Sequence, residues 1–144
     1  FNNNIVSNEH KVEQYLAMNP LNFHEVSRGL NDDGVALRNK AYAEINKSQF
    51  VAAISSFGQL QDKTLEDEFF LAYANMATKN YEEAGVTFRK LESEIQPSQK
   101  YFEEIKFFSA LCKLATESHS AKEILSKLPL NSWSRSELES ILSK

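Results

Sequence analysis

The sequence has little of what would point to chemistry. Its 144 residues include four glycines, three prolines, three histidines and one cysteine. The single Cys112 cannot form a disulfide within the chain, and no glycine-rich phosphate loop or G-x-S-x-G turn is present. The histidines lie in separate segments without metal-ligand spacing. We therefore predict no enzyme activity, no cofactor and no metal site, and we place Cys112 in the core.

Charge and hydropathy argue against two further classes of partner. Sixteen basic and twenty acidic side chains give a net charge of −4, and the basic residues form no block along the chain. Binding to nucleic acid requires clustered positive charge, so we predict no nucleic-acid partner. The chain also has no run of about 18 apolar residues, so we predict that it does not itself insert into a membrane.

The sequence is rich in helix-forming residues, which occur in segments separated by short breaks. Apolar residues at helical spacing and the stop at Pro20 predict a first helix over residues 9–18, capped by Ser7 or Asn8. Further helices are predicted over residues 34–46, 49–60, 65–78, 81–95, 99–116, 121–128 and 135–143. No alternating run rich in Val, Ile and Thr predicts a strand, so the fold class is all-α.

Two stretches, "NKSQFVAAISSFGQL" and "TKNYEEAGVTFRKL", share a frame of residues 31 positions apart. An alanine on each of two crossing helices lets the backbones approach, while aromatic residues fill the ends of the contact. The repeat therefore predicts stacked antiparallel helical hairpins. The matched pairs are Ala41 and Ala72, Phe50 and Tyr81, Ala53 and Ala84, Phe57 and Phe88, and Leu60 and Leu91.

This frame resembles the tetratricopeptide repeat (TPR), whose second helix carries the same A-x-x-x-F element. The resemblance implies a right-handed superhelix of about three hairpins within residues 34–128, over 34–62, 65–96 and 99–128. Residues 1–33 would form an N-terminal arm with a short helix, and residues 129–144 a C-terminal capping helix. The third unit is the poorest copy, because it has Leu125 in place of the phenylalanine and "ESHS" in place of the aromatic turn.

A narrower resemblance concerns the N-terminal region. A short helix ending near "QYLAMNP", then "SRG", then repeats, is similar to TPR-type domains that follow a single membrane helix in Bacteroidetes-like bacteria. The chain begins with Phe1, and "FNNNIVSN" has neither the basic head nor the apolar centre of a leader. We expect a longer, membrane-anchored precursor with this domain outside the cytoplasm, and a cytoplasmic location stays open.

A TPR-like stack implies a concave surface formed by the first helix of each hairpin. We predict that this surface is an apolar and aromatic groove that binds a protein or peptide, because such residue types are enriched at interface cores. Two alternatives stay open: the same residues are ordinary core, or the N-terminal arm lies against the first repeat and covers part of the groove. The predicted groove residues are Arg38, Tyr42, Ile45, Phe69, Tyr73, Met76 and Phe107.

Self-association is the second functional hypothesis. In it, the groove or the terminal helix that carries Trp133 packs against another copy of the chain, which gives a homo-oligomer. A basic clamp for acidic peptide tails, as some TPR domains have, is disfavoured because the second unit offers Phe69 and Phe70 where such a clamp needs cations.

Overall fold

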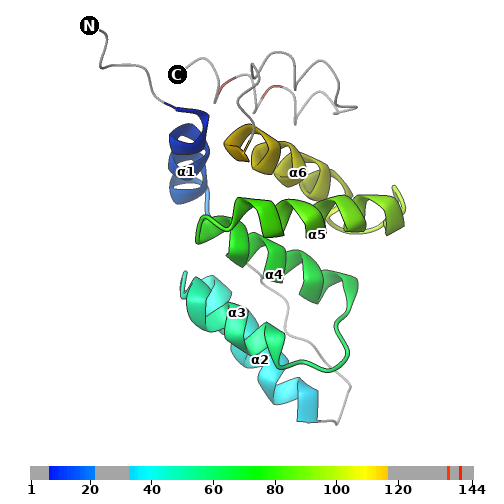
Figure 1. Cartoon of the computed structure of the whole chain (residues 1–144). Helices are drawn as coiled ribbons and strands as arrows, with labels where there is room; N and C mark the ends of the chain where they lie inside the picture. Colours follow the sequence, from blue (N-terminus) through cyan, green and yellow to red (C-terminus); the bar gives the residue numbers. More distant parts are fainter. Residues whose placement is uncertain (1–6, 22–32, 117–135, 137–139, 141–144) are drawn as a thin grey trace, which may run out of the picture.

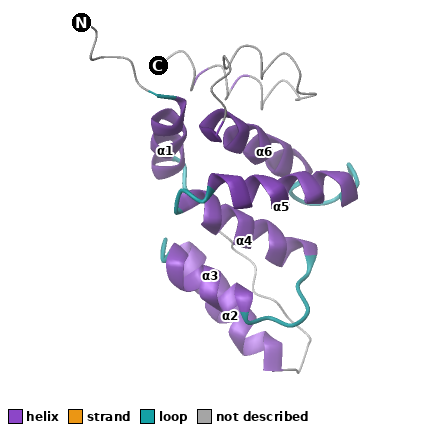
Figure 2. Cartoon of the chain, in the orientation of Figure 1, coloured by secondary structure: helices purple, strands orange, loops and turns teal. Residues whose placement is uncertain are grey.

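The computed structural model describes residues 7–21 and 33–116, together with residues 136 and 140. Every regular element in this part of the chain is a helix (Figure 2), so the predicted all-α fold class is confirmed. The six helices, in chain order, are α1 (Asn8–Met18), α2 (Asp33–Asn46), α3 (Phe50–Gly58), α4 (Leu65–Ala77), α5 (Tyr81–Glu94) and α6 (Phe102–Thr116). The helices predicted over 121–128 and 135–143 lie mostly outside the described residues.

The helix starts follow from capping residues in the sequence. Ser7 caps α1 as predicted, and its hydroxyl accepts a hydrogen bond from the His10 N–H at 3.1 Å. Thr64 and Asp67 form a capping box at the start of α4, in which each side chain accepts from the backbone N–H of the other residue. Acidic residues in the first turns of α4, α5 and α6 face the positive ends of the helix dipoles.

The two hairpin turns are copies of each other. Ser48, between α2 and α3, and Lys79, between α4 and α5, lie 31 residues apart and both adopt left-handed backbone, with φ of 57° and 73°. Each N–H donates to the carbonyl three residues back at 3.0 Å, and the next N–H donates to the carbonyl five residues back at 2.8 Å. This pair of bonds is the Schellman motif that ends many helices. The sequence period of 31 is therefore also a structural period.

The helices stack in chain order, as Figure 1 shows from α2 at one end to α6 near the other. α2 packs on α3, α3 on α4, α4 on α5 and α5 on α6. The described residues thus form two hairpins, α2–α3 and α4–α5, followed by α6, the predicted first helix of a third unit. The right-handed superhelical arrangement stays a prediction.

The shared frame forms the core of this stack. Alanines at the helix crossings have no exposed surface, and the aromatic rings between them are buried as well. The predicted role of the frame as a packing rule is confirmed. Its fully buried members are Ala41, Ala53, Phe57, Ala72, Ala84, Phe88 and Leu91.

The N-terminal helix packs on the last of the described helices. α1 lies against α6, at the end of the stack away from α2 (Figure 1). The apolar face of α1 accounts for this position, because Val12 and Leu16 are buried there and the Tyr15 ring meets the Phe107 ring edge-on at 5.4 Å. Further along, the Leu21 N–H donates to the Tyr73 hydroxyl on α4 at 2.8 Å. The described part of the N-terminal arm therefore contacts α4 and α6. The rest of the arm that we expect against the first repeat, residues 22–32, lies outside the described residues.

Candidate partner-binding site

All seven predicted groove residues lie inside the domain. They are at most 7% exposed, so in this conformation they form packing between helices and not an open groove. Their role in binding a partner stays a prediction. Their exposed fractions are 7% for Arg38, 4% for Tyr42, 1% for Ile45, Tyr73 and Phe107, and 0% for Phe69 and Met76.

The first two of these residues belong to a buried polar cluster between the hairpins. The Arg38 guanidinium on α2 donates from Nε to both carboxylate oxygens of Asp67 on α4, at 3.2 and 3.0 Å, and from Nη2 to the Asp62 carbonyl at 2.9 Å. The Tyr42 hydroxyl donates to Asp67 Oδ1 at 2.8 Å. Burial and the neighbouring Asp67 carboxylate raise the pKa of Tyr42 far above its ordinary value. These hydrogen bonds run from α2 to Asp67 on α4 and to the Asp62 carbonyl, so the cluster joins the two hairpins.

Phe69 and Phe107 belong to an aromatic cluster between the second hairpin and α6. The Phe69 ring stacks on Tyr101 at 4.5 Å with an interplanar angle of 16°, and it also contacts Phe88 and Phe108. Sequence reasoning missed Tyr101 and Asp67. An acidic residue in a first helical turn is ordinarily a dipole or capping residue, and Asp67 does cap α4. Its second role depends on Arg38, which lies 29 residues earlier.

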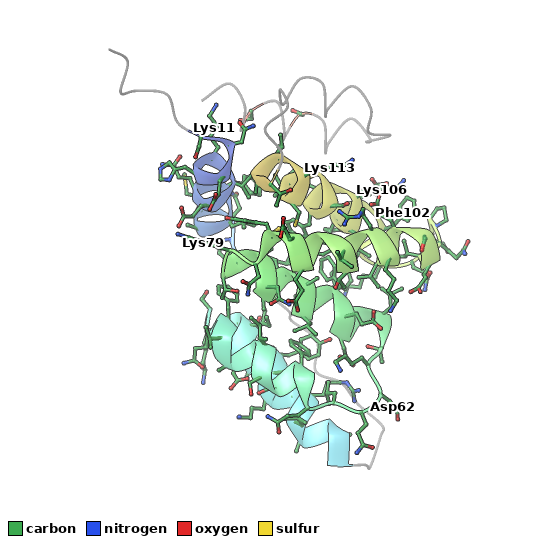
Figure 3. All side chains as sticks on the ribbon, viewed as in Figure 1. Lys11, Asp62, Lys79, Phe102, Lys106 and Lys113 are labelled. Carbon is green, nitrogen blue, oxygen red and sulfur yellow. The ribbon has the colours of Figure 1, made fainter. Side chains whose placement is uncertain are left out.

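The face of α4 and α6 that the groove prediction singled out is occupied by the chain's own N-terminal segment. Tyr15 covers Phe107, and the backbone of Leu21 is bound to Tyr73. An ion pair adds to these contacts, because Lys79 Nζ at the α4–α5 turn lies 2.9 Å from Glu13 Oε2 on α1. Figure 3 shows Lys79 on the side of the stack where α1 lies. The N-terminal segment of the chain therefore covers part of this face.

A cavity remains between α1 and the repeats. Its volume is about 230 Å³, and its walls come from α1, the first residue of α3, the last turns of α4 and the first residue of α5. Phe50 and Tyr81, which match each other in the repeat, both line it. The sequence could identify these two aromatic residues but not their neighbours on α1, since no local pattern shows where α1 docks. The lining residues are Glu13, Leu16, Ala17, Phe50, Tyr73, Ala77 and Tyr81.

Negative charge surrounds this cavity. The hydrogen bond from Lys79 lowers the pKa of the Glu13 carboxyl, so Glu13 is ionised at neutral pH. Burial, reinforced by the Glu13 and Glu9 carboxylates, raises the pKa of Tyr81 to about 12. Glu9, Lys79 and Tyr81 also line a neighbouring surface hollow of about 450 Å³. The charged groups near Tyr81 thus include the carboxylates of Glu9 and Glu13 and the ammonium of Lys79.

Other chemistry is weakly represented in the described residues. Cys112 is buried against α5, and burial raises the pKa of its thiol to about 12, which disfavours the nucleophilic thiolate. Within residues 7–21 and 33–116, no group of three His, Cys, Asp or Glu side chains could hold a metal ion. No helix in the same ranges has the length and apolar character needed to cross a bilayer.

Comparisons of the chain with protein-family models, with curated proteins and with solved structures find no match.

Proposed function

We propose that this domain is a non-enzymatic protein-interaction module of TPR-like type that binds a segment of a partner protein on the face of its first helices. One observation carries the proposal: that face already holds an amphipathic helix, α1, of the chain itself. α1 is held by the burial of Val12 and Leu16, by one ring contact and by one ion pair. A helix laid with its apolar face in a groove is a recurring mode of peptide recognition.

Two features support the same proposal. The helical hairpins repeat with a period of 31 residues, and repeat stacks offer extended binding surfaces. The described residues, in addition, offer aromatic side chains and few candidates for catalysis. Membership of the TPR family and anchorage to a bacterial membrane belong to this proposal and rest on the sequence resemblance alone.

A peptide with the sequence of residues 7–21 tests whether this face accepts a helix from another chain. The full-length Val12→Asp variant places a charge where the Val12 side chain is fully buried, and this should release α1 from α6. We expect fluorescence anisotropy to show one-to-one binding of the labelled peptide to this variant and much weaker binding to the wild type. Val51→Asp on α3, at a position 75% exposed, is the matched control and should behave as the wild type.

Failure of the peptide to bind Val12→Asp, when circular dichroism shows that the remaining helices are intact, would overturn the proposal. Tyr15→Ala covers the case in which Val12→Asp unfolds the whole chain, because it removes the ring contact with Phe107 and introduces no charge. It should give the same change with a smaller amplitude.

Self-association is the second candidate, and the same contact favours it. If α1 of one copy docked on α6 of another, the contacts of Val12 and Tyr15 would be kept and the chain would form an exchanged dimer. Light scattering over a concentration series separates the candidates. A wild-type monomer at the highest concentration excludes the exchange.

A further inference from the structure

The cavity between α1 and the repeats has the walls of an aromatic box. Phe50, Tyr73 and Tyr81 come from three different helices and line the same space of about 230 Å³. The rings of Phe50 and Tyr73 stand at 82° to each other with centroids 5.7 Å apart, so they form adjoining walls. One water needs only about 10–15 Å³ of such space. The cavity is therefore large enough for a side chain.

Charge distinguishes this cavity from an apolar packing defect. The Glu13 carboxylate lines it while its side chain is still 41% exposed, so this charge lies between the cavity and solvent. Among the described residues of the repeats, Lys79 is the only cation that pairs with the Glu13 carboxylate, with 2.9 Å between Nζ and Oε2. Burial raises the pKa of Tyr81, and the Glu13 and Glu9 carboxylates raise it further. Aromatic side chains and a carboxylate that line one cavity together favour an organic cation.

We propose that the cavity binds the side chain of a lysine from the partner protein, with its methylene stem against Leu16, Ala17 and Ala77 and its ammonium group among the aromatic rings toward Glu13. This inference rests on the proposed function, because it names the chemistry of the partner at one position. It applies to a partner segment that lies beside the docked α1, since Glu13, Leu16 and Ala17 of α1 line the cavity. The ammonium of Lys79 is then a competitor, since it already pairs with Glu13. An incoming lysine replaces one ammonium by another at the carboxylate and adds contacts with the rings.

Titration of the full-length protein with n-butylammonium, followed by the NMR signals of aromatic ring protons, tests the inference directly. The neutral probe n-butanol has the same stem without the charge. We expect saturable binding of butylammonium that is about fivefold or more tighter than binding of butanol, in line with the usual strength of cation–π contacts. Equal affinity for the two probes would overturn the proposal.

Three variants locate the binding. Phe50→Leu and Glu13→Gln should each weaken butylammonium binding by about fivefold, because they remove a wall and the charge. Lys79→Met should strengthen it, since the competing ammonium is absent. Lys79 is exposed, so this variant leaves the core intact and keeps the test decisive if Phe50→Leu fails to fold. A loss of affinity in Lys79→Met would contradict the proposal.

The matched control is on α6. The ring of Phe102 already has a cation over it, with Lys106 Nζ 4.1 Å from the centroid; Figure 3 labels both residues. Phe102 does not line the cavity. Phe102→Leu should therefore leave the affinity for butylammonium unchanged. If Phe102→Leu weakens binding as much as Phe50→Leu, the cation binds exposed rings in general and the cavity inference fails.

A final pair of probes separates this inference from the proposed function. N-acetyl-lysine methylamide should bind as tightly as butylammonium, whereas its arginine counterpart should bind more weakly. Exclusion of the capped lysine would mean that the cavity takes only a free small amine, which overturns the assignment to a partner. If the peptide of residues 7–21 fails to bind Val12→Asp while butylammonium binds the wild type, the cavity is confirmed and the proposed function is wrong.

Discussion

The two hairpins α2–α3 and α4–α5 share the backbone of their turns and differ in their interfaces. Their turns make the same hydrogen bonds at positions 31 residues apart, and their alanines sit at the same crossings. Yet Arg38 in the first hairpin corresponds to Phe69 in the second. The first hairpin is joined to its neighbour by an ion pair and a tyrosine hydroxyl, whereas the second is joined to α6 by stacked rings.

A second difference concerns how closely the next helix approaches. Gly85 on α5 corresponds to Ile54 on α3, and a Cβ at Gly85 would lie 3.4 Å from the Cβ of Cys112 on α6. The repeat frame thus sets where helices lie, while the chemistry at the contact between units is free to change. Each interface between neighbouring units of a repeat stack can therefore have its own chemistry.

Removing the carboxylate from the polar interface should have the largest effect. Asp67→Ala leaves the buried Arg38 without its partner and abolishes the capping box of α4, so we expect unfolding free energy to fall by about 3–5 kcal/mol. Urea denaturation measures this change. Asp62→Ala is the control, because Arg38 bonds the Asp62 carbonyl and the exposed Asp62 side chain is expendable.

Adding Arg38→Met to Asp67→Ala should recover part of the stability, since no buried charge then remains unpaired. A loss below about 1 kcal/mol in Asp67→Ala would mean that the two interfaces do not differ as described, given that such a pair ordinarily costs more when broken.

Alkaline pH should destabilise the second interface through Cys112. The pKa of Cys112 is raised from 9.0 to about 12 by burial, so above pH 9 the thiol ionises in the unfolded chain while it stays protonated in the folded one. This contribution to stability is complete below pH 9 and is lost as pH rises toward 12. We expect the wild type to lose roughly 2–3 kcal/mol by pH 11 relative to Cys112→Ala. A constant difference between the two proteins would contradict this expectation.

Replacing Gly85 by the isoleucine found at the matching position of the first hairpin should test how closely α5 and α6 approach each other. Gly85→Ile, which copies Ile54, should overpack the contact with Cys112 and reduce unfolding free energy by about 1–3 kcal/mol. Gly85→Ala is the matched control. Its single methyl meets only the movable end of Arg89 below 3.4 Å, so we expect between no change and about 1 kcal/mol of stabilisation from the better helix former. Thermal denaturation of both variants ranks them.

The smallest effects should come from the turns. Ser48→Gly relieves a left-handed residue in the first turn and should raise unfolding free energy by about 0.5–1 kcal/mol. Lys79→Gly relieves the same strain in the second turn but removes the ion pair with Glu13, so its gain should be smaller. Ser55→Gly, inside α3, is the control and should destabilise the protein. Equal gains at both turns would mean that Lys79 does not help to hold α1.

Sequence reasoning predicted the elements of this fold better than its surfaces. The bounds of α1 to α5 were predicted to within two residues, because local signals such as Ser7, the breaks and the period determine where helices start and stop. Among the described residues the largest error is at α6, which was expected from residue 99 and starts at Phe102. Tyr101, in left-handed backbone, precedes that start.

The candidate site could not be predicted in the same way. The periodicity shows that Tyr42, Phe69 and Tyr73 share helical faces, but on a first helix both the groove face and the interface face can be aromatic. Whether an aromatic residue faces a groove or an interface depends on partners that are distant in the sequence, such as Asp67 for Tyr42 and Leu21 for Tyr73. The cavity depends on α1, whose docking on α6 has no counterpart in the repeat.

That docking makes the order of folding unlike that of an ordinary repeat array. In such arrays each unit contacts only its neighbours, so folding can begin anywhere and spread. Here the end of α1 is separated from the start of α6 by 84 positions (102 − 18), a contact of high order that closes late. During synthesis at about 5–20 residues per second, α1 waits roughly 4–17 s for its partner helix. Among the described helices, α1 is therefore made first and finds its place last.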